Sequence, residues 1–241
     1  MEILIMKLEA PLMSFGGVMV DQHGPTDRFP ACSLLAGLLA NALGYRHAEF
    51  GKTQTLQDRI EFAARWDVEP KKVSDYQTVD LGQEKMRDLG WTTRGVAEHR
   101  SGGSAAKFGT HQRYREYWSD GVLTVALSLI NDQSPNIRQL AEALQRPKRP
   151  LFIGRKSCLP SRPIFQAITS DENVYQAIRQ MPIDERASAD QQEFSACWPG
   201  SDREQISSSR VVNRYDKRSW CDQLHTGGRW QREGEIPREP S

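Results

Sequence analysis

The sequence has no long apolar run, no leader-like segment and no strong excess of charge of either sign. None of its hydrophobic stretches approaches the ~20 residues that a membrane-spanning helix requires, so no membrane contact is expected. The apolar beginning of the chain is interrupted by Glu2, Lys7 and Glu9, which argues against a signal peptide. We therefore expect a cytoplasmic protein.

The sequence also lacks the motifs of metal and nucleotide sites. No Cys-x-x-Cys pair and no P-loop pattern occur, so neither a structural zinc site nor nucleoside triphosphate binding is expected. Acidic residues at 184–185 and 202–204 lie in polar stretches without apolar strands to present them, which argues against a two-metal site. No cofactor is expected. The four cysteines are isolated and are expected to be reduced thiols: Cys32, Cys158, Cys197 and Cys221.

What the chain does contain is two concentrated basic segments in a protein of net charge +1. Residues 81–118 hold 7 Lys and Arg against 4 Asp and Glu, and residues 146–165 hold 6 against none. With 38% hydrophobic residues in 241, the chain is typical of a globular protein of one large or two small domains. Localised positive charge is what contact with a nucleic-acid backbone requires. These segments therefore predict binding of a polyanion.

One helix organises the N-terminal half. The leucines of 34–43 recur at helical spacing, Pro30 suits the first turn, and Gly44 suits a left-handed helix end. Gly37 is expected to let the helix lie close to a sheet. Arg28 stands just before the helix, where unpaired N–H groups favour anions. The segment is either a core helix after a turn or, at its beginning, a phosphate site.

The order of expected elements is strand, helix, strand, strand, strand, helix. Strands are expected at 2–9, 59–69, 73–81 and 122–130, and helices at 30–44, 53–58 and 134–144. Ser134 is the expected cap of the last helix, with Pro135 at its first position. This order matches a ferredoxin-like (RRM-like) α+β unit with an antiparallel sheet, βαββαβ, whose last strand follows.

Two loops interrupt this order. In residues 10–27, Met13, Phe15 and Met19 either stack on bases or fold under as a small core. Residues 82–111 show no sustained period, and they combine basic groups with aromatics and glycines. They are either an arm that lies along a nucleic-acid backbone or a flexible hairpin with a solvated face, and we favour the arm.

The second basic segment contains a glycine turn. Residues 151–153 could be a short strand, Gly154 a tight turn, and Arg155, Lys156 and Ser157 follow it. Backbone N–H groups at such a turn, together with two cations, make a phosphate-binding nest. Beyond it, we expect a helix in 171–181, a polar loop in 184–203, a strand in 206–215 and a disordered tail over 226–241.

Several of these stretches occur in the order of a known family. They are DYQTV at 75–79, PLMSFG at 11–16, GPTDRFPACSLLAGLLANALG at 24–44, REYWSDGVLTVALSL at 115–129 and FIGRKSCLPSRPIF at 152–165. Together they resemble the Cas-five (CasD) family of type I-E CRISPR Cascade subunits, in the RAMP superfamily. The resemblance covers roughly residues 1–170. It implies a RAMP domain over 1–165 with a β-hairpin thumb at 82–111, a small β-rich C-terminal extension over 166–225 and the tail over 226–241.

The resemblance also implies a function and partners. A family member binds the 5′ handle of CRISPR RNA (crRNA) and caps the backbone filament. It contacts the backbone subunit (CasC), the large subunit (CasA) and, through the complex, target DNA in antiviral defence. The residues expected to bind RNA are Met13, Ser14, Phe15, Gly16, Gly17, Gln22, Arg28, Arg94, Lys107, His111, Arg113, Arg115, Gly154, Arg155, Lys156 and Ser157.

No catalytic residue is expected, although an alternative remains. Type I-C relatives use this subunit as a metal-independent endoribonuclease that processes the CRISPR repeat. That chemistry needs a general base at the 2′-hydroxyl and an acid or cation for the leaving oxygen. The candidates match no nuclease motif, and the strong motifs are those of type I-E: His99, Lys107, His111, Tyr114 and Tyr117. A non-catalytic RNA-binding subunit is the favoured interpretation.

Overall fold

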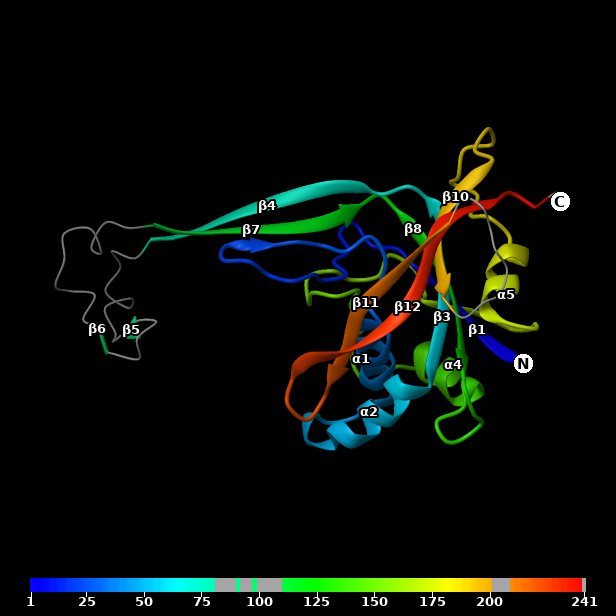
Figure 1. The fold of residues 1–241 in the computed structure, drawn as a ribbon, viewed down its shortest axis with the longest axis horizontal. Helices are drawn as coiled ribbons and strands as arrows, with labels where there is room; N and C mark the ends of the chain where they lie inside the picture. Colours follow the sequence, from blue (N-terminus) through cyan, green and yellow to red (C-terminus); the bar gives the residue numbers. More distant parts are fainter. Residues whose placement is uncertain (81–89, 92–96, 99–109, 201–208, 240–241) are drawn as a thin grey trace.

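The computed structural model describes residues 1–80, 90–91, 97–98, 110–200 and 209–239. The chain is α+β, and its main sheet has seven antiparallel strands in the order β11-β12-β10-β3-β8-β1-β9 (Figure 1). The strands are β1 (Glu2–Leu8), β3 (Ile60–Val68), β8 (Val122–Leu129), β9 (Phe165–Ser170), β10 (Glu193–Pro199), β11 (Arg210–Ser219) and β12 (Leu224–Pro237).

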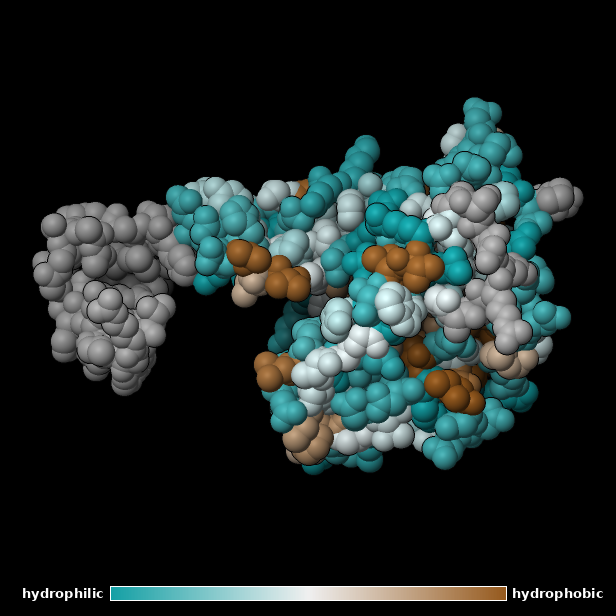
Figure 2. Space-filling view, in the orientation of Figure 1, coloured by the Kyte–Doolittle hydropathy of each residue, from teal (hydrophilic) through white to brown (hydrophobic). Residues whose placement is uncertain are grey.

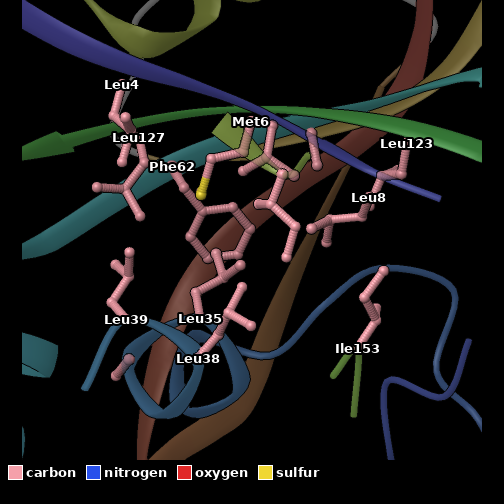
Figure 3. Packing of buried hydrophobic residues seen from close by; sticks show 14 of the residues in the cluster. Leu4, Met6, Leu8, Leu35, Leu38, Leu39, Phe62, Leu123, Leu127 and Ile153 are labelled. Carbon is pink, nitrogen blue, oxygen red and sulfur yellow. The ribbon is translucent and has the colours of Figure 1, made fainter. Parts of the chain in front are cut away.

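Both faces of this sheet are covered, because successive residues of a strand point to opposite faces. Leu4, Met6 and Leu8 of β1 pack with residues of α1 (Cys32–Leu43) and α4 (Ile137–Gln145). Ile3 and Ile5 pack on the other face with α5 (Val174–Gln180). Figure 3 shows the first of these clusters, in which side chains of the sheet point toward α1. The sheet therefore lies between two apolar clusters.

The predicted ends of α1 are partly confirmed. Gly44 ends the helix in the left-handed conformation, with φ 80°. Pro30 was expected in the first turn, but it lies outside the helix, because the N-cap is Ala31 and the helix begins at Cys32. A 3-10 turn, η1 (His47–Glu49), leads into α2 (Phe50–Arg59), which is longer than expected and begins earlier.

The beginning of α4 differs from the prediction by two residues. Asn136, not Ser134, is the cap: its side chain accepts a hydrogen bond from the Gln139 N–H at 3.0 Å, and the Gln139 side chain accepts one from the Asn136 N–H at 2.9 Å. This reciprocal capping box satisfies two helix-end donors at once, whereas Ser134 could satisfy one. Pro135 therefore precedes the helix.

A second sheet forms an arm that projects from the main sheet (Figure 1). In it, β7 (Thr110–Ser119) pairs antiparallel with β4 (Lys71–Asp80) and parallel with β2 (His23–Gly24). Two short strands, β5 (Gly90–Trp91) and β6 (Ala97–Glu98), pair with each other. The rest of the expected thumb, 82–111, lies outside the described residues, including Arg94 and Lys107.

The C-terminal third departs most from the sequence expectations. The expected polar loop at 184–203 contains β10, and the expected disordered tail at 226–241 contains most of β12. No strand forms at 151–153, and β9 follows at Phe165 instead. Charged residues of β12 lie inside the fold because they are paired: Arg229 with Asp216, and Glu233 with Arg214. Because charged residues occupy inward positions of β12, its sequence lacks the alternation of apolar and polar residues by which strands are predicted.

Figure 2 shows a mostly hydrophilic surface with several separate hydrophobic patches. Among the described residues, no helix is long and apolar enough to cross a membrane. In the same part of the chain, no group of three or more His, Cys, Asp or Glu residues is placed to bind a metal ion.

Candidate nucleic-acid interface

The loop after β1 lies between the arm and the glycine turn. Met13 and Trp118 exchange two backbone hydrogen bonds of 2.7 and 2.8 Å, which attach the loop to β7. The next residue, Ser14, donates its N–H to the carbonyl of Ile153 at 3.2 Å. The two loops expected to bind RNA, 13–17 and 154–157, are therefore neighbours in space.

Gly154 is required where these loops meet. Its φ of +93° lies in the left-handed region, and a Cβ at this position would overlap the carbonyl oxygen of Ser14. Two further hydrogen bonds close the turn: the Ile153 N–H donates to the Cys158 carbonyl, and the Cys158 N–H to the Arg155 carbonyl, both at 2.8 Å. Only glycine allows this close approach of two backbones.

Met13, Ser14 and Phe15 were expected to bind RNA, but their side chains are buried. Phe15 lies 5.8 Å from Trp66 between ring centroids, and both belong to the main core. Base stacking by Met13 or Phe15 is thus corrected to core packing, since burial stabilises these side chains more than exposure on a loop. The exposed part of the loop follows them: Gly17, Val18, Met19 and Val20.

The two cations of the glycine turn differ. Arg155 donates to the carbonyls of Glu116 at 3.0 Å and Gly24 at 3.3 Å, and its guanidinium lies 4.5 Å from the Tyr117 ring centroid. It therefore ties the turn to the base of the arm. Lys156 and Ser157 are exposed. The sequence predicted two equivalent phosphate contacts, whereas the structure has one positioning residue and one solvent-facing cation.

An anion site was one of two alternatives for the beginning of α1, and a carboxylate of the chain itself lies there. The Cys32 N–H donates to Asp216 of β11 at 3.1 Å. Arg28 does not face this helix end freely: its guanidinium forms an ion pair with Glu69 and lies about 5.5 Å from the ring centroids of Trp66 and Trp118. The Asp216 carboxylate therefore satisfies one of the first N–H groups of α1, and a phosphate at this helix end would compete with it.

Three of the residues predicted to bind RNA lie on β7, in the arm. Arg113 donates to the carbonyl of Asp21 at 3.1 Å, and the Tyr114 N–H donates to the carbonyl of Gln22 at 2.9 Å. Arg115 is exposed beside Asp75 in the register of β4 and β7. His111 belongs to β7, but its side chain lies outside what the structure describes.

A cleft of about 610 Å³ opens where the two loops meet the C-terminal hairpin; we call it the loop cleft. One wall is formed by the predicted loops, 14–19 and 154–155. The floor is the first part of α1, including Ser33 and Leu34. The opposite wall comes from the hairpin of β11 and β12, which the sequence reasoning did not assign to the site: Tyr215, Asp216, Arg218, Trp220 and His225.

Gln57 of α2 holds this second wall in place. Its buried side chain accepts from the Arg218 N–H and from Trp220 Nε1, each at 3.1 Å, and donates to the Arg218 carbonyl at 2.9 Å. Gly37 was expected to face a sheet, but it faces Trp220, which lies 3.2 Å from where a Cβ would be. A buried polar residue so fully satisfied fixes the hairpin against the helices.

Two buried cysteine thiols are not prepared for chemistry. Burial, with the nearby Asp216 carboxylate, raises the pKa of Cys32 to about 12. Burial likewise raises the pKa of Cys197 to about 12. Both thiols are therefore protonated at neutral pH, and a thiol rather than a thiolate is a weak nucleophile.

Comparison with solved structures identifies the class of fold. The fold matches a chain of a "CRISPR RNA-guided surveillance complex", with a TM-score of 0.66 and 20% identity over 98% of this chain and 90% of that one. It also matches a "Crystal structure of Cas protein", with a TM-score of 0.61 and 19% identity over 98% and 95% of the two chains. The fold is therefore that of a CRISPR-associated protein.

Sequence comparison gives the family. Residues 3–232 match the model of "CRISPR-associated protein (Cas_Cas5)". The chain is 32% identical over 170 residues to "CRISPR system Cascade subunit CasD" of Escherichia coli (strain K12), covering 67% of this chain and 69% of that protein. The chain belongs to the Cas5 family, which confirms the resemblance given by its sequence motifs.

Proposed function

We propose that this Cas5-family protein is a non-catalytic, RNA-binding subunit of a type I-E Cascade surveillance complex. The observation that carries the proposal is the loop cleft, which combines a glycine turn, Gly154–Arg155, with a hairpin wall bearing Arg218 and Trp220. The exposed cation Lys156 follows this turn directly in the chain. Cations supply backbone contacts, and aromatic rings supply surfaces for unpaired bases. The E. coli relative's name, a Cascade subunit, supports the assignment to such a complex.

The ligand that we propose for this cleft is the 5′ handle of crRNA. Gly16, Gly17 and Ser157 would approach the RNA backbone closely, and Lys156 would contact phosphate. Gln22, Arg113 and Arg115, at the base of the arm, would extend the contact along the strand. Phosphate contacts would supply most of the affinity, and bases splayed into the cleft would supply selectivity.

The domain arrangement supports a ferredoxin-like unit with an insertion. If β1, β3, β8 and β9 are numbered one to four, their order in the sheet corresponds to 4-1-3-2, with α1 and α4 as the crossover helices. The arm of β4 and β7 is inserted between the second and third of these strands. We propose that it is the thumb, that it contacts the backbone subunit, and that Arg94, Lys107 and His111 contribute RNA contacts there.

The remaining partners follow from the same assignment. The protein would cap one end of the backbone filament, contact the large subunit and meet target DNA only through the assembled complex, in the cytoplasm. Deletion of Gly90–Phe108 would leave a folded domain that assembles poorly with backbone subunits. Normal assembly of the deletion variant, measured by co-purification, would refute the thumb assignment.

Binding and cleavage are separated by one assay. The purified full chain is incubated with labelled repeat RNA in EDTA and run on native and denaturing gels. Binding without cleavage supports the proposal. Cleavage at a single position that survives EDTA would instead make the protein a metal-independent processing nuclease. Absence of binding, both alone and with backbone subunits present, would contradict RNA binding altogether.

A further inference from the structure

A second hollow, of about 440 Å³, adjoins the loop cleft at the C-terminal end of α1. It shares Ser33, Leu34, Gly154, Arg218 and Trp220 with the loop cleft, so the two form one continuous depression along the helix. We call it the Tyr45 hollow. Its other functional side chains come from the turn after α1 and from the basic segment: Asn41, Tyr45, Arg46, His47, Phe50, Arg149 and Phe152.

The Tyr45 hollow is lined by charge of one sign. Three arginines and a histidine line it, and none of the described residues that line it is acidic. The loop cleft includes Asp27 and Asp216, and a third hollow beside Trp230 includes Asp58 and Glu61. A concave surface with cations and no carboxylate concentrates anions. Of these three hollows, the Tyr45 hollow therefore suits a phosphate best.

Arg149 covers one local feature that would repel an anion. The carbonyls at the end of a helix carry partial negative charge. Arg149 donates to the Tyr45 carbonyl at 2.7 Å and to the Gly44 carbonyl at 3.0 Å, so it covers these groups. A guanidinium has five N–H donors in a fixed plane, so donors remain for a ligand after these two bonds.

Aromatic rings line the same space. Phe50 is 43% exposed, and Tyr45, Phe152 and Trp220 are half-buried. The Trp220 ring is held by its hydrogen bond to Gln57 and by the Arg218 guanidinium, 5.4 Å from its centroid. Partly exposed rings beside cations are suited to a ligand with a flat aromatic part and an anionic part. A nucleotide has both.

We infer that the Tyr45 hollow binds one unstacked nucleotide of the RNA strand that occupies the loop cleft. The base lies against Phe50 and Trp220, and the phosphate accepts hydrogen bonds from Arg149 and Arg46. The volume falls within the range of small-molecule sites, roughly 300–1,000 Å³. The inference rests on the proposed RNA-binding function, and it adds the turn after α1 to the residues that select the RNA.

The first test uses mononucleotides and the full chain. Binding of AMP, CMP, GMP and UMP is compared by calorimetry with that of the matching nucleosides and of inorganic phosphate. At least one nucleoside monophosphate is expected to bind more tightly than either of its parts. Arg149→Ala and Phe50→Ala are each expected to weaken this binding about tenfold, through loss of a charge-assisted hydrogen bond or of base stacking.

Matched controls lie close by. Lys148→Ala removes the neighbouring exposed cation, and Leu224→Ala removes an apolar side chain that is 62% exposed; neither residue lines the hollow. Both controls are expected to bind nucleotides as the unchanged protein does. Because Arg149 also covers a helix end, Arg46→Ala, which removes an exposed cation, repeats the test without that contact. Equal nucleotide binding by all variants, or no nucleotide binding at all, would overturn the inference.

A second test places the nucleotide within RNA. A single-stranded RNA with 2-aminopurine at successive positions is bound to the full chain, and its fluorescence reports stacking of that base. Quenching at one position that is lost in Phe50→Ala supports the inference. RNA binding with no such position would overturn the inference while leaving the proposed function intact. No RNA binding by any variant would count against the proposed function, and the RNA assignment of the hollow would fall with it.

Discussion

The two walls of the loop cleft are built in different ways. The wall that contains Gly154 is held by backbone geometry, since two loops approach so closely that no side chain fits between them. The wall that contains Trp220 is held by side-chain hydrogen bonds to distant elements. Gln57 of α2 accepts from Trp220 Nε1, and Asp216 of this wall accepts from the Cys32 N–H at the beginning of α1. Where two backbones approach closely, a glycine is required, so the first wall can be predicted from the sequence. Buried hydrogen bonds between distant residues produce no local sequence pattern, so the other wall cannot be predicted in this way.

The largest expected effect comes from the first wall. Gly154→Ala combines a left-handed backbone with overlap at the Ser14 carbonyl, and we expect it to lower the free energy of unfolding by at least about 3 kcal/mol and to abolish RNA binding. Gly16→Ala is the control, because its φ is +78° but no atom of the described residues lies within 4 Å of where its Cβ would be. Its expected cost is about 1 kcal/mol. Equal costs in denaturant unfolding would contradict the close-approach explanation.

The second wall is tested by Gln57→Ala. The change leaves the Arg218 N–H and carbonyl and Trp220 Nε1 without their partner, with an expected cost of about 2–3 kcal/mol. RNA binding should weaken because the hairpin is no longer held over α1. Thr55→Ala, on the exposed face of the same helix, should change stability by less than about 0.5 kcal/mol. Unchanged RNA binding in Gln57→Ala would show that the hairpin wall is not part of the site.

The basic segment 146–165, which contains Gly154, is also attached to the fold through a hydrogen bond from Arg162 to Asp184. Burial alone would raise the pKa of the Asp184 carboxyl. Hydrogen bonds from Lys7 at 2.7 Å and Arg162 at 2.9 Å outweigh this effect and lower the pKa to about 2. Because the folded pKa lies below the unfolded value near 3.9, the ionised group stabilises the fold above that pH. This stabilisation is lost as the pH falls from about 4 to about 2.

The matching variant is Asp184→Asn, which we expect to lower the free energy of unfolding at pH 7 by about 2 kcal/mol. The difference from the unchanged protein should shrink as the pH is lowered through that range, as measured by urea unfolding at several pH values. Asp190→Asn, an exposed site nearby, is the control. A difference that stays constant down to pH 2 would contradict the ionic role.

The smallest effect on stability distinguishes the two cations of the turn. Lys156→Ala should leave stability unchanged and reduce the slope of log affinity for RNA against log salt by about one. Arg155→Ala should weaken RNA binding too, with a stability loss of about 1–2 kcal/mol from its bonds to Gly24 and Glu116. An unchanged salt slope in both variants would remove the glycine turn from the RNA contact.

Local patterns predicted much of this protein. The end of α1 at Gly44, the apolar strand β8 and the tight turn at Gly154 each depend on residues close in sequence, and all three are confirmed. The family resemblance is likewise confirmed. The sequence left open whether Met13 and Phe15 are exposed and whether an anion binds before Cys32. The burial of Phe15 and the capping of α1 depend on partners far along the chain, Trp66 and Asp216.

The C-terminal third was the least predictable, for a physical reason. In β12, Arg229, Gln231 and Glu233 face inward in a chain of ion pairs and hydrogen bonds, so the strand resembles a charged tail. The residues that build the second wall, Arg218 and Trp220, lie next to this segment. Their role follows only once the pairing of β11 with β12 is known.

The most direct test of the central claim is crosslinking. The full chain, bound to a single-stranded repeat RNA that contains 4-thiouridine, is irradiated, digested and mapped by mass spectrometry. We predict crosslinks on both walls of the loop cleft, at 16–19 and 154–157 on one side and at 215–225 on the other. Crosslinks confined to other surfaces, such as the outer edge of β9 or the α5 face, would contradict the claim that this cleft binds RNA.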